Sequence, residues 1–546
     1  MKRSHHLPWA LLLLPVLGCP SADEPVPEPD PTPAPLTAFE QAVDALGGAD
    51  ALSSLAHLRI EASGDRWIDY EGLVPSELHD ACTYATTSLF DLSTGDARVD
   101  VTRTGLFEAF QFFPEETYSV VLNGDVGGLT AQAGFYPVGA MPSQHVGALR
   151  RQHRLFNPHL VLRDALANAS SVTDGGEQDL DGRAHRLFTL TDEGSDLRMF
   201  VDSETGLISK LETMENSPLL RDVPVEVRFG DWQASGELTF PRTVELWAVE
   251  GLVQGEARSA IEVDPTDVAA DAFALPPEAG APVVDADAFA FGHESHQVVE
   301  AFFQIFFGYD PGGSSQASEL APGVVLFAAG ANSLGIEVDG GVVLLEGPNS
   351  PAHGSHIVEM VASEFPGLPI THLIQSHHHQ DHSAGVRSIA AAGAKVVVGP
   401  GVGSFFEDVL AAPSTIRPDA LSMSDATTEV EEVPANGTTV IADADVTVTA
   451  YHFAANPHAD DMVVTLVDLG TSRFLYQADL YNGGFGFTAV VGGQAALFAG
   501  LRDLGILDAD CNSPVPLSIV SAHGLVQTVD ESLTELSGLG VDVGCP

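Results

Sequence analysis

Residues 376–383 read Ser-His-His-His-Gln-Asp-His-Ser and carry the densest set of metal-binding side chains in the chain. In an extended loop, residues two apart face the same way, so His377 and His379 can hold one cation. Asp381 and His382 can then turn toward a neighbouring one. Imidazole and carboxylate together suit zinc or another borderline divalent metal. His378 matches no ligand position and is interpreted as a bystander.

The elements around this loop must hold it rigidly. A buried strand, Thr371–Ser376, leads into it, and a helix over Ser383–Ala392 follows. From about Glu319 onward, helices alternate with short apolar strands, which predicts a layered α/β architecture. The other expected elements are strands at 324–327, 341–346, 395–398, 446–450, 462–466 and 473–476, and a helix at 355–365.

His-x-His-x-Asp-His directly after a strand resembles the motif of the metallo-β-lactamase-fold hydrolases. The resemblance covers residues 319–546 and implies an αββα sandwich. It also implies three later ligands, each following a strand, for which His458, Asp479 and His523 fit. The implied first metal site is His377, His379 and His458, the implied second is Asp381, His382 and His523, and Asp479 bridges them.

Two positions near these ligands leave alternatives open. His452 competes with His458, but it precedes the turn that should present the ligand, so His458 is preferred. Glu346 stands where the family often has an aspartate that hydrogen-bonds a ligand histidine, and its longer side chain can do the same. The alternative for Glu346 is a buried carboxylate at a strand end with some other partner. Asp460 and Asp461 either orient His458 or cap the following turn, and neither is assigned.

The resemblance implies a dinuclear metal-dependent hydrolase, with two zinc ions or, alternatively, iron or manganese. A metal-bridging hydroxide would attack an ester, lactone, thioester or amide carbonyl of a small molecule. Asp381 is the candidate catalytic residue, shuttling the proton to the leaving group. One alternative is a mononuclear iron enzyme of the sulfur dioxygenase type. Another is a non-catalytic lipoprotein that binds lipid or peptide.

The N-terminus predicts export. Lys2 and Arg3 precede an apolar run, Leu7–Leu17, that is too short to span a bilayer, and Leu17-Gly18-Cys19 resembles a lipoprotein cleavage site. Residues 1–18 are therefore interpreted as a signal peptide and Cys19 as a lipidated anchor. The expected location is a membrane facing the periplasm or the cell exterior. An ordinary secretory signal is the alternative. Residues 19–35 are acidic and proline-rich, which indicates an extended tether.

Residues 36–274 form a second folded unit. Thr37-x-x-Glu40 predicts a helix start, and Gly47-Gly48 predicts its end. Short alternating runs such as Leu58–Ala62 and Val225–Phe229 then indicate mostly antiparallel strands. The amino-acid sequences of residues 45–64, 201–212 and 229–241 weakly resemble those of periplasmic lipoprotein carriers, which fold as a curved half-barrel. This resemblance implies a concave sheet able to hold lipid or peptide. A structural spacer or docking domain is the favoured alternative, and residues 275–318 are the linker.

Charge and cysteines set further limits. The chain has 76 Asp+Glu against 23 Lys+Arg, a formal charge of −53, which argues against nucleic acid as a partner. Lysine occurs only three times, so the acidity is interpreted as surface adaptation, for example to salt. An exported chain can keep disulfides, and Cys511 and Cys545 are close enough in sequence to clamp the C-terminus. The alternative is that these two and Cys82 are unpaired thiols.

Overall fold

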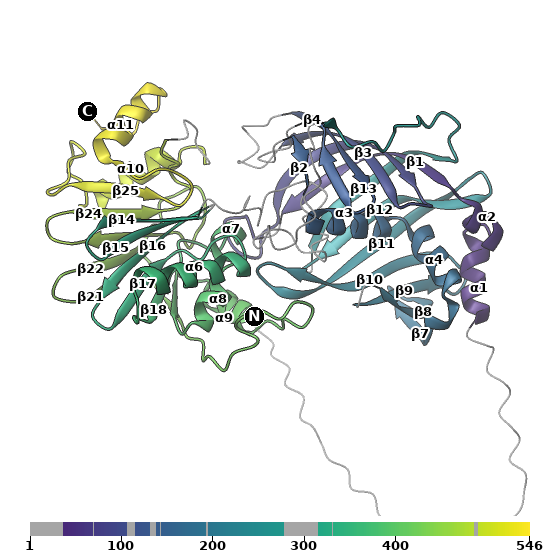
Figure 1. Ribbon diagram of the computed structural model, residues 1–546, viewed down its shortest axis with the longest axis horizontal. Coiled ribbons are helices and arrows are strands. Elements are labelled where there is room, and N and C mark those ends of the chain that lie inside the picture. The colour runs from purple at the N-terminus through teal and green to yellow at the C-terminus, as the bar shows by residue number, and fades with distance from the viewer. Residues whose placement is uncertain are drawn as a thin grey trace, which may run out of the picture.

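The computed structural model describes residues 36–68, 70–105, 115–131, 138–141, 143–192, 195–249, 251–277, 315–329, 331–484 and 490–545. The predicted signal peptide, Cys19, the predicted tether and most of the predicted linker lie outside these residues. Figure 1 shows the described chain as two lobes, here called the N-terminal module (residues 36–277) and the C-terminal module (residues 315–545). The exact domain boundaries stay a prediction.

The N-terminal module contains one antiparallel sheet of 13 strands, in the order β6-β5-β4-β3-β2-β1-β13-β12-β11-β10-β9-β8-β7. The prediction of a mostly antiparallel module is confirmed at this level. Its strands are β1 (His57–Ile68), β2 (His79–Asp91), β3 (Asp96–Gly105), β4 (Glu116–Asn123), β5 (Val126–Leu129), β6 (Gly139–Ala140), β7 (Thr173–Leu180), β8 (Arg183–Asp192), β9 (Ser195–Asp202), β10 (Ile208–Ser217), β11 (Arg221–Ser235), β12 (Leu238–Ala248) and β13 (Gly251–Val263).

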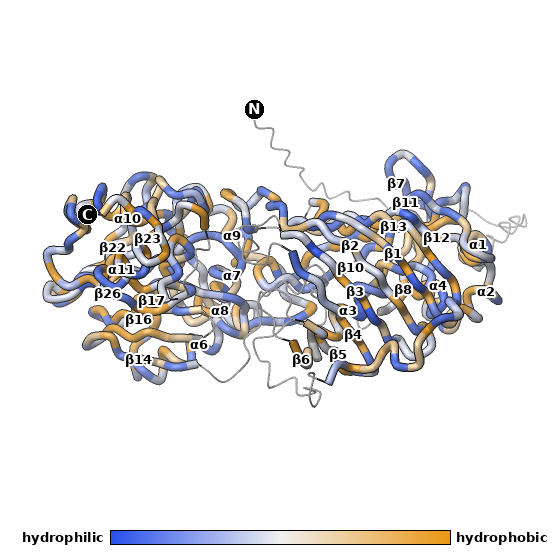
Figure 2. Tube along the Cα trace, turned by 90° about the horizontal axis from the view of Figure 1, so that it is seen from above, coloured by the Kyte–Doolittle hydropathy of each residue, from blue (hydrophilic) through white to orange (hydrophobic). Residues whose placement is uncertain are grey.

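Along strands such as β1 and β3, buried and exposed residues largely alternate. Figure 2 shows hydrophobic and hydrophilic segments, in orange and blue, along the strands of this module. The buried side chains pack with those of four helices into one core. The helices are α1 (Leu36–Ala45), α2 (Ala49–Ser54), α3 (Ser143–Phe156) and α4 (Pro158–Ala167). α1 begins one residue before Thr37, so Thr37 lies inside the helix and not at its cap. Gly47, with φ 123°, follows the end of α1 as predicted.

The C-terminal module contains two mixed sheets. One has the order β14-β15-β16-β17-β18-β19-β20 and the other β21-β22-β23-β24-β25-β26. Pairs β17–β18 and β24–β25 are parallel. The strands are β14 (Gln316–Ala321), β15 (Val324–Ala329), β16 (Ala331–Val338), β17 (Gly341–Leu345), β18 (Ile370–Ile374), β19 (Lys395–Val398), β20 (Val430–Glu432), β21 (Thr438–Ala442), β22 (Thr447–His452), β23 (Val463–Asp468), β24 (Arg473–Gln477), β25 (Leu517–Ser521) and β26 (Gln527–Thr528).

The continuous apolar run of β17 is explained by burial on both faces. Val342 and Leu344 join a cluster with helices α6 (Pro351–Glu364), α8 (Val386–Ala391) and α9 (Gly403–Ala411). Val343 and Leu345 join a second cluster, which lies between the two sheets. A third cluster packs the other face of the second sheet against α10 (Gly493–Asp503) and α11 (Val529–Gly538). These clusters hold the strand ends in fixed positions.

Two predicted helices differ from the observed ones in a way that matters for the site. α6 begins at Pro351, earlier than predicted, because the Ser350 side chain accepts the His353 N–H and caps the helix. The helix predicted over 383–392 is two: a short α7 (Gln380–Ser383) and then α8. The loop after β18 is therefore extended only as far as His379.

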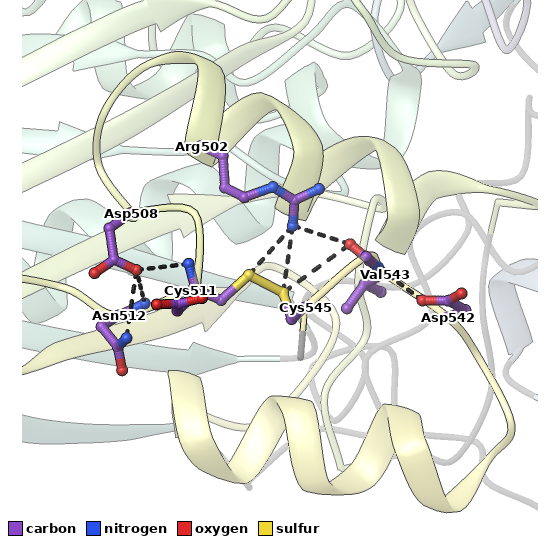
Figure 3. Close-up of a disulfide and its surroundings, with 9 residues drawn as sticks. Arg502, Asp508, Cys511, Asn512, Asp542, Val543 and Cys545 are labelled. Carbon is purple, nitrogen blue, oxygen red and sulfur yellow. Dashed lines mark hydrogen bonds between the residues drawn. A yellow bond between two sulfur atoms is a disulfide. The ribbon is translucent and has the colours of Figure 1, made fainter.

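The structure has a disulfide between Cys511 and Cys545, which lie on the chain segments after α10 and after α11. The Arg502 guanidinium contacts both sulfurs and donates to the Val543 carbonyl at 3.0 Å (Figure 3). Cys82 is a buried free thiol, and burial raises its pKa to about 12. Among the helices of the described ranges, none is long and apolar enough to cross a bilayer.

Candidate metal centre

Glu346 and three of the candidate ligands follow the carboxyl ends of strands in the two sheets. Glu346 follows β17, His377 follows β18, Asp479 follows β24 and His523 follows β25. Because the carboxyl ends of parallel neighbours meet at the same edge of a sheet, each parallel pair brings two of these side chains together, one pair in each sheet. The contact of His382 with Asp479 at 2.7 Å joins the two edges. The strands that the sequence predicts therefore position the site that it predicts.

One donor group consists of three histidines and an aspartate. His377 Nε2 lies 3.2 Å from His458 Nε2, and both face Asp479 Oδ2, at 3.6 and 3.2 Å. His379, the residue before α7, completes the group. The ligand atoms all lie within 4.8 Å of one another and belong to His377, His379, His458 and Asp479.

A second donor group shares Asp479. His382 Nε2 lies 2.7 Å from Asp479 Oδ2 and 3.4 Å from Asp381 Oδ2. His523 Nε2 lies 3.3 Å from Asp381 Oδ2 and 3.8 Å from Asp479 Oδ1. The structure thus brings together all seven residues expected as ligands, and it divides them as the resemblance implies: Asp381, His382, Asp479 and His523 form the second group.

The chemistry of these donors fits cations. Two imidazole nitrogens at 3.2 Å cannot both direct lone pairs at each other favourably unless a proton or a cation lies between them. Asp381 Oδ1 and His523 Nε2 are buried atoms with no hydrogen-bond partner among the described residues. Buried polar groups in proteins are normally satisfied, and functional sites are a common exception. Two divalent ions would satisfy these atoms together.

Burial and mutual repulsion keep the first group in the right protonation state. Burial first, and then the neighbouring histidines, hold the pKa values of His377 and His379 well below the usual range. Burial raises the pKa of Asp479, but the charge of His382 and its hydrogen bond outweigh burial and leave that pKa well below normal. Neutral imidazoles and an ionised carboxylate are the forms that bind metal.

Glu346 lies where the expected partner of a ligand histidine should be. It is fully buried, and its Oε1 is 3.5 Å from His382 Nδ1. Gln375 Nε2 donates both to this Oε1 and to the His382 carbonyl, which ties the three residues together. A carboxylate at Nδ1 leaves Nε2 of His382 to face the second group.

The backbone is strained at both Glu346 and Asp479. Their φ angles are 77° and 61°, in the left-handed region that non-glycine residues rarely adopt. Such positions cost roughly 1 kcal/mol or more each and occur mostly at functional sites. The backbone at both strand ends is thus bent to aim a carboxylate at the same histidine, His382.

The structure shows the contacts of three further histidines, His378, His452 and His458. His378 is not in either donor group, but it is buried and pairs with Asp461 through Nδ1 and Oδ1 at 2.7 Å. His452 also lies outside both groups: its Nδ1 accepts from the Asn436 backbone, and its Nε2 lies 3.0 Å from the Asp460 carbonyl. His458, the preferred alternative, is the one that joins the site.

Sequence reasoning missed one contribution, which comes from the N-terminal module. Glu71 forms a third potential ligand group with His379 and Asp381, and the Gly72 carbonyl lies 2.9 Å from His379 Nε2. Burial, followed by the charge of Asp381, raises the pKa of Glu71 well above its usual range. A glutamate in a turn-rich loop more than 300 residues away gives no local signal of this kind.

No protein-family model matches the sequence, and no curated protein matches it. Solved structures do match. A metallo-β-lactamase from Hirschia baltica is 16% identical, with a TM-score of 0.30, over 43% of this chain and 99% of its own. A stereoselective inverting sec-alkylsulfatase from Pseudomonas sp. is 17% identical, with a TM-score of 0.30, over 41% of each chain. A metallo-β-lactamase from Pontibacter korlensis is 13% identical, with a TM-score of 0.29, over 42% of this chain and 100% of its own. These three solved structures are metallo-β-lactamase-fold proteins.

Proposed function

We propose that this protein is a metal-dependent hydrolase with two adjacent cation positions. The observation that supports this most directly is the pair of four-residue donor groups that share Asp479. A complete second group argues against the mononuclear iron dioxygenase alternative, which needs only the first. Donor sets with room for a water or substrate usually serve reactions and not structure, which disfavours the non-catalytic alternative.

Bound divalent ions would polarise a substrate carbonyl and lower the pKa of a water at the site. The residues of the chain divide the remaining work. Asp381, whose Oδ1 has no hydrogen-bond partner among the described residues, can accept the proton of the attacking water and pass it to the leaving group. The His523 side chain is 25% exposed, whereas those of His377 and His382 are fully buried, so substrate would approach from the His523 side.

The substrate class that this chemistry fits is an ester, lactone, thioester or amide of a small molecule. The finer fold assignment, an αββα sandwich after a half-barrel-like module, is part of the same proposal. So is export as a membrane-anchored lipoprotein through Cys19, with nucleic acid excluded as a partner. Zinc is the proposed metal, with iron or manganese as alternatives. The N-terminal module is proposed to dock the enzyme or to bind lipid or peptide.

The test combines metal content with a hydrolysis screen over lactones, thioesters and β-lactams. We expect two divalent ions per chain in the wild type. His377→Ala should lower metal content and reduce hydrolysis by about 100-fold or more, because a lost ligand costs at least as much as a lost partner of a ligand. His452→Ala is the matched control, since His452 lies outside both donor groups. A metal-free wild type, or undiminished hydrolysis by His377→Ala, would overturn the proposal.

A further inference from the structure

A loop of the N-terminal module, residues 70–78 between β1 and β2, lies against the metal centre. Three consecutive residues of this loop contact it or its surroundings. The Glu71 carboxylate accepts the Gln380 backbone N–H at 3.2 Å, and the Gly72 carbonyl lies 2.9 Å from His379 Nε2. The Leu73 carbonyl accepts the Asp460 N–H at 2.9 Å, close in sequence to His458. The loop thus touches the segments that carry two ligands of the first group.

The contact at Gly72 fixes the tautomer of His379. A carbonyl oxygen can only accept a hydrogen bond, so His379 Nε2 must carry the proton and donate it. In a neutral imidazole, the lone pair is then on Nδ1. Histidines that bind metals almost always donate their other N–H in this way, and the partner sets the orientation of the ring. His382 receives its partner, Glu346, from the C-terminal module, whereas His379 receives its partner from the other module.

Glu71 faces His379 Nδ1, the ring nitrogen that does not contact the Gly72 carbonyl. Its Oε2 lies 3.5 Å from His379 Nδ1, and its side chain is 3% exposed. A carboxylate oxygen and an imidazole lone pair are both acceptors, so they repel each other unless a cation or a proton lies between them. Donor atoms of Glu71, His379 and Asp381 lie within 4.8 Å of one another.

We propose that the metal centre is built from both modules, with Glu71 as an additional ligand beside His379 and the Gly72 carbonyl as the group that orients His379. The inference rests on the proposed function, because it assigns residues to a metal site. It implies that the affinity for the metal depends on how the N-terminal module docks. If that module were only a spacer, the affinity for the metal would not depend on its docking.

Contacts outside the donor groups also join the two modules. The Tyr70 ring is 6% exposed, packs 5.4 Å from the Phe405 ring and belongs to the core cluster around α6, α8 and α9. Farther along the interface, Arg221 of the N-terminal module lies 3.4 Å from Asp419 and donates to the Arg417 carbonyl at 3.0 Å. Apolar packing at Tyr70 and the buried ion pair at Arg221 thus join the two modules in addition to the contacts at the metal centre.

The test uses the full-length protein and Co²⁺ as a spectroscopic probe. Metal-free wild type and Glu71→Gln are titrated with Co²⁺, by visible absorption and by competition with a chelator. Glutamine keeps an oxygen for the Gln380 N–H but loses the negative charge. Asp80→Asn, on an exposed residue at the start of β2, removes the same charge from the same module and is the matched control.

We expect Glu71→Gln to bind its most tightly held Co²⁺ about 10-fold or more weakly and to shift the absorption bands, while Asp80→Asn behaves as wild type. Equal affinity and identical spectra for Glu71→Gln and wild type would overturn the inference and leave the proposed function standing. A wild type that takes up no Co²⁺ would instead overturn the proposed function. If Glu71→Gln does not fold, Glu71→Asp, which keeps the charge but shortens the reach, provides the same comparison.

Discussion

His159 should make the N-terminal module sensitive to acid, independently of any metal. It is the second residue of α4, is 2% exposed, and stacks on Phe240 with ring centroids 4.0 Å apart. Its Nε2 lies 2.8 Å from the Thr239 carbonyl and must donate to it, while its Nδ1 is buried with no hydrogen-bond partner among the described residues. Burial lowers the pKa of His159 to about 3. Protonating Nδ1 would therefore place an unpaired charge in the core.

The sign and size of the effect follow from this pKa. An unfolded histidine has a pKa of about 6.5, so between pH 6.5 and pH 3 the unfolded chain binds a proton that the folded chain does not. The free energy of unfolding falls as pH falls through this window, by about 1.4 kcal/mol per unit. At pH 5, His159 alone should lower it by about 2 kcal/mol relative to pH 7.

The assay is denaturant unfolding at pH 7 and pH 5, followed by tryptophan fluorescence, because Trp232 lies 6.3 Å from the His159 ring. His159→Gln keeps a side-chain N–H that can reach the Thr239 carbonyl but cannot titrate. Its loss of stability between pH 7 and pH 5 should be smaller than that of wild type by about 2 kcal/mol. His57→Gln, at a partly exposed histidine of β1, should lose as much as wild type. Equal losses for His159→Gln and wild type would refute the reasoning.

Two further outcomes are expected. Metal uptake near pH 7 should release protons. Burial lowers the pKa of His382, but the charges of Asp381 and Asp479 outweigh burial and hold that pKa well above normal. The metal-free protein therefore carries a proton on His382 that the metal displaces. Metal affinity should therefore fall as pH falls, and calorimetry in buffers of different ionisation enthalpy would contradict this if no proton were released. Asp461→Ala should lower the free energy of unfolding by about 2 kcal/mol, because it leaves a buried nitrogen of His378 without its hydrogen-bond partner. A loss below about 1 kcal/mol in urea unfolding would show that the pair contributes little.

His377, His379, Asp381 and His382 could be predicted because they form one local motif after a predicted strand. His458, Asp479 and His523 followed from the resemblance to the metallo-β-lactamase-fold hydrolases, whose later ligands each follow a strand. The shape of the loop that carries the motif could not be predicted in the same way. Residues 376–383 read as one extended loop, but α7 begins at Gln380, so Asp381 and His382 lie on a helical turn. The two donor groups are the same in either case, because what fixes them is the position of the strand ends.

Glu71 and Gly72 could not be predicted, for a physical reason. Their role depends on the docking of two modules whose contacting residues are more than 300 positions apart in sequence. No periodicity or capping pattern encodes such a contact, and a backbone carbonyl has no residue identity to recognise. Arg221 illustrates the same limit: it is 2% exposed and lies in the left-handed region at φ 65°, but in the sequence it resembles any strand-end arginine.

The acidity of the chain bears on why a second module would supply a ligand. A site with several carboxylates in a protein of formal charge −53 attracts any divalent cation, so attraction alone does not select one. Selectivity must come from geometry and from the types of ligand. Orientation of His379 by Gly72, and of His382 by Glu346, fixes two imidazole nitrogens before a metal arrives. A site preorganised in this way from both modules would favour metals that prefer imidazole, and would weaken for all of them if the N-terminal module were displaced.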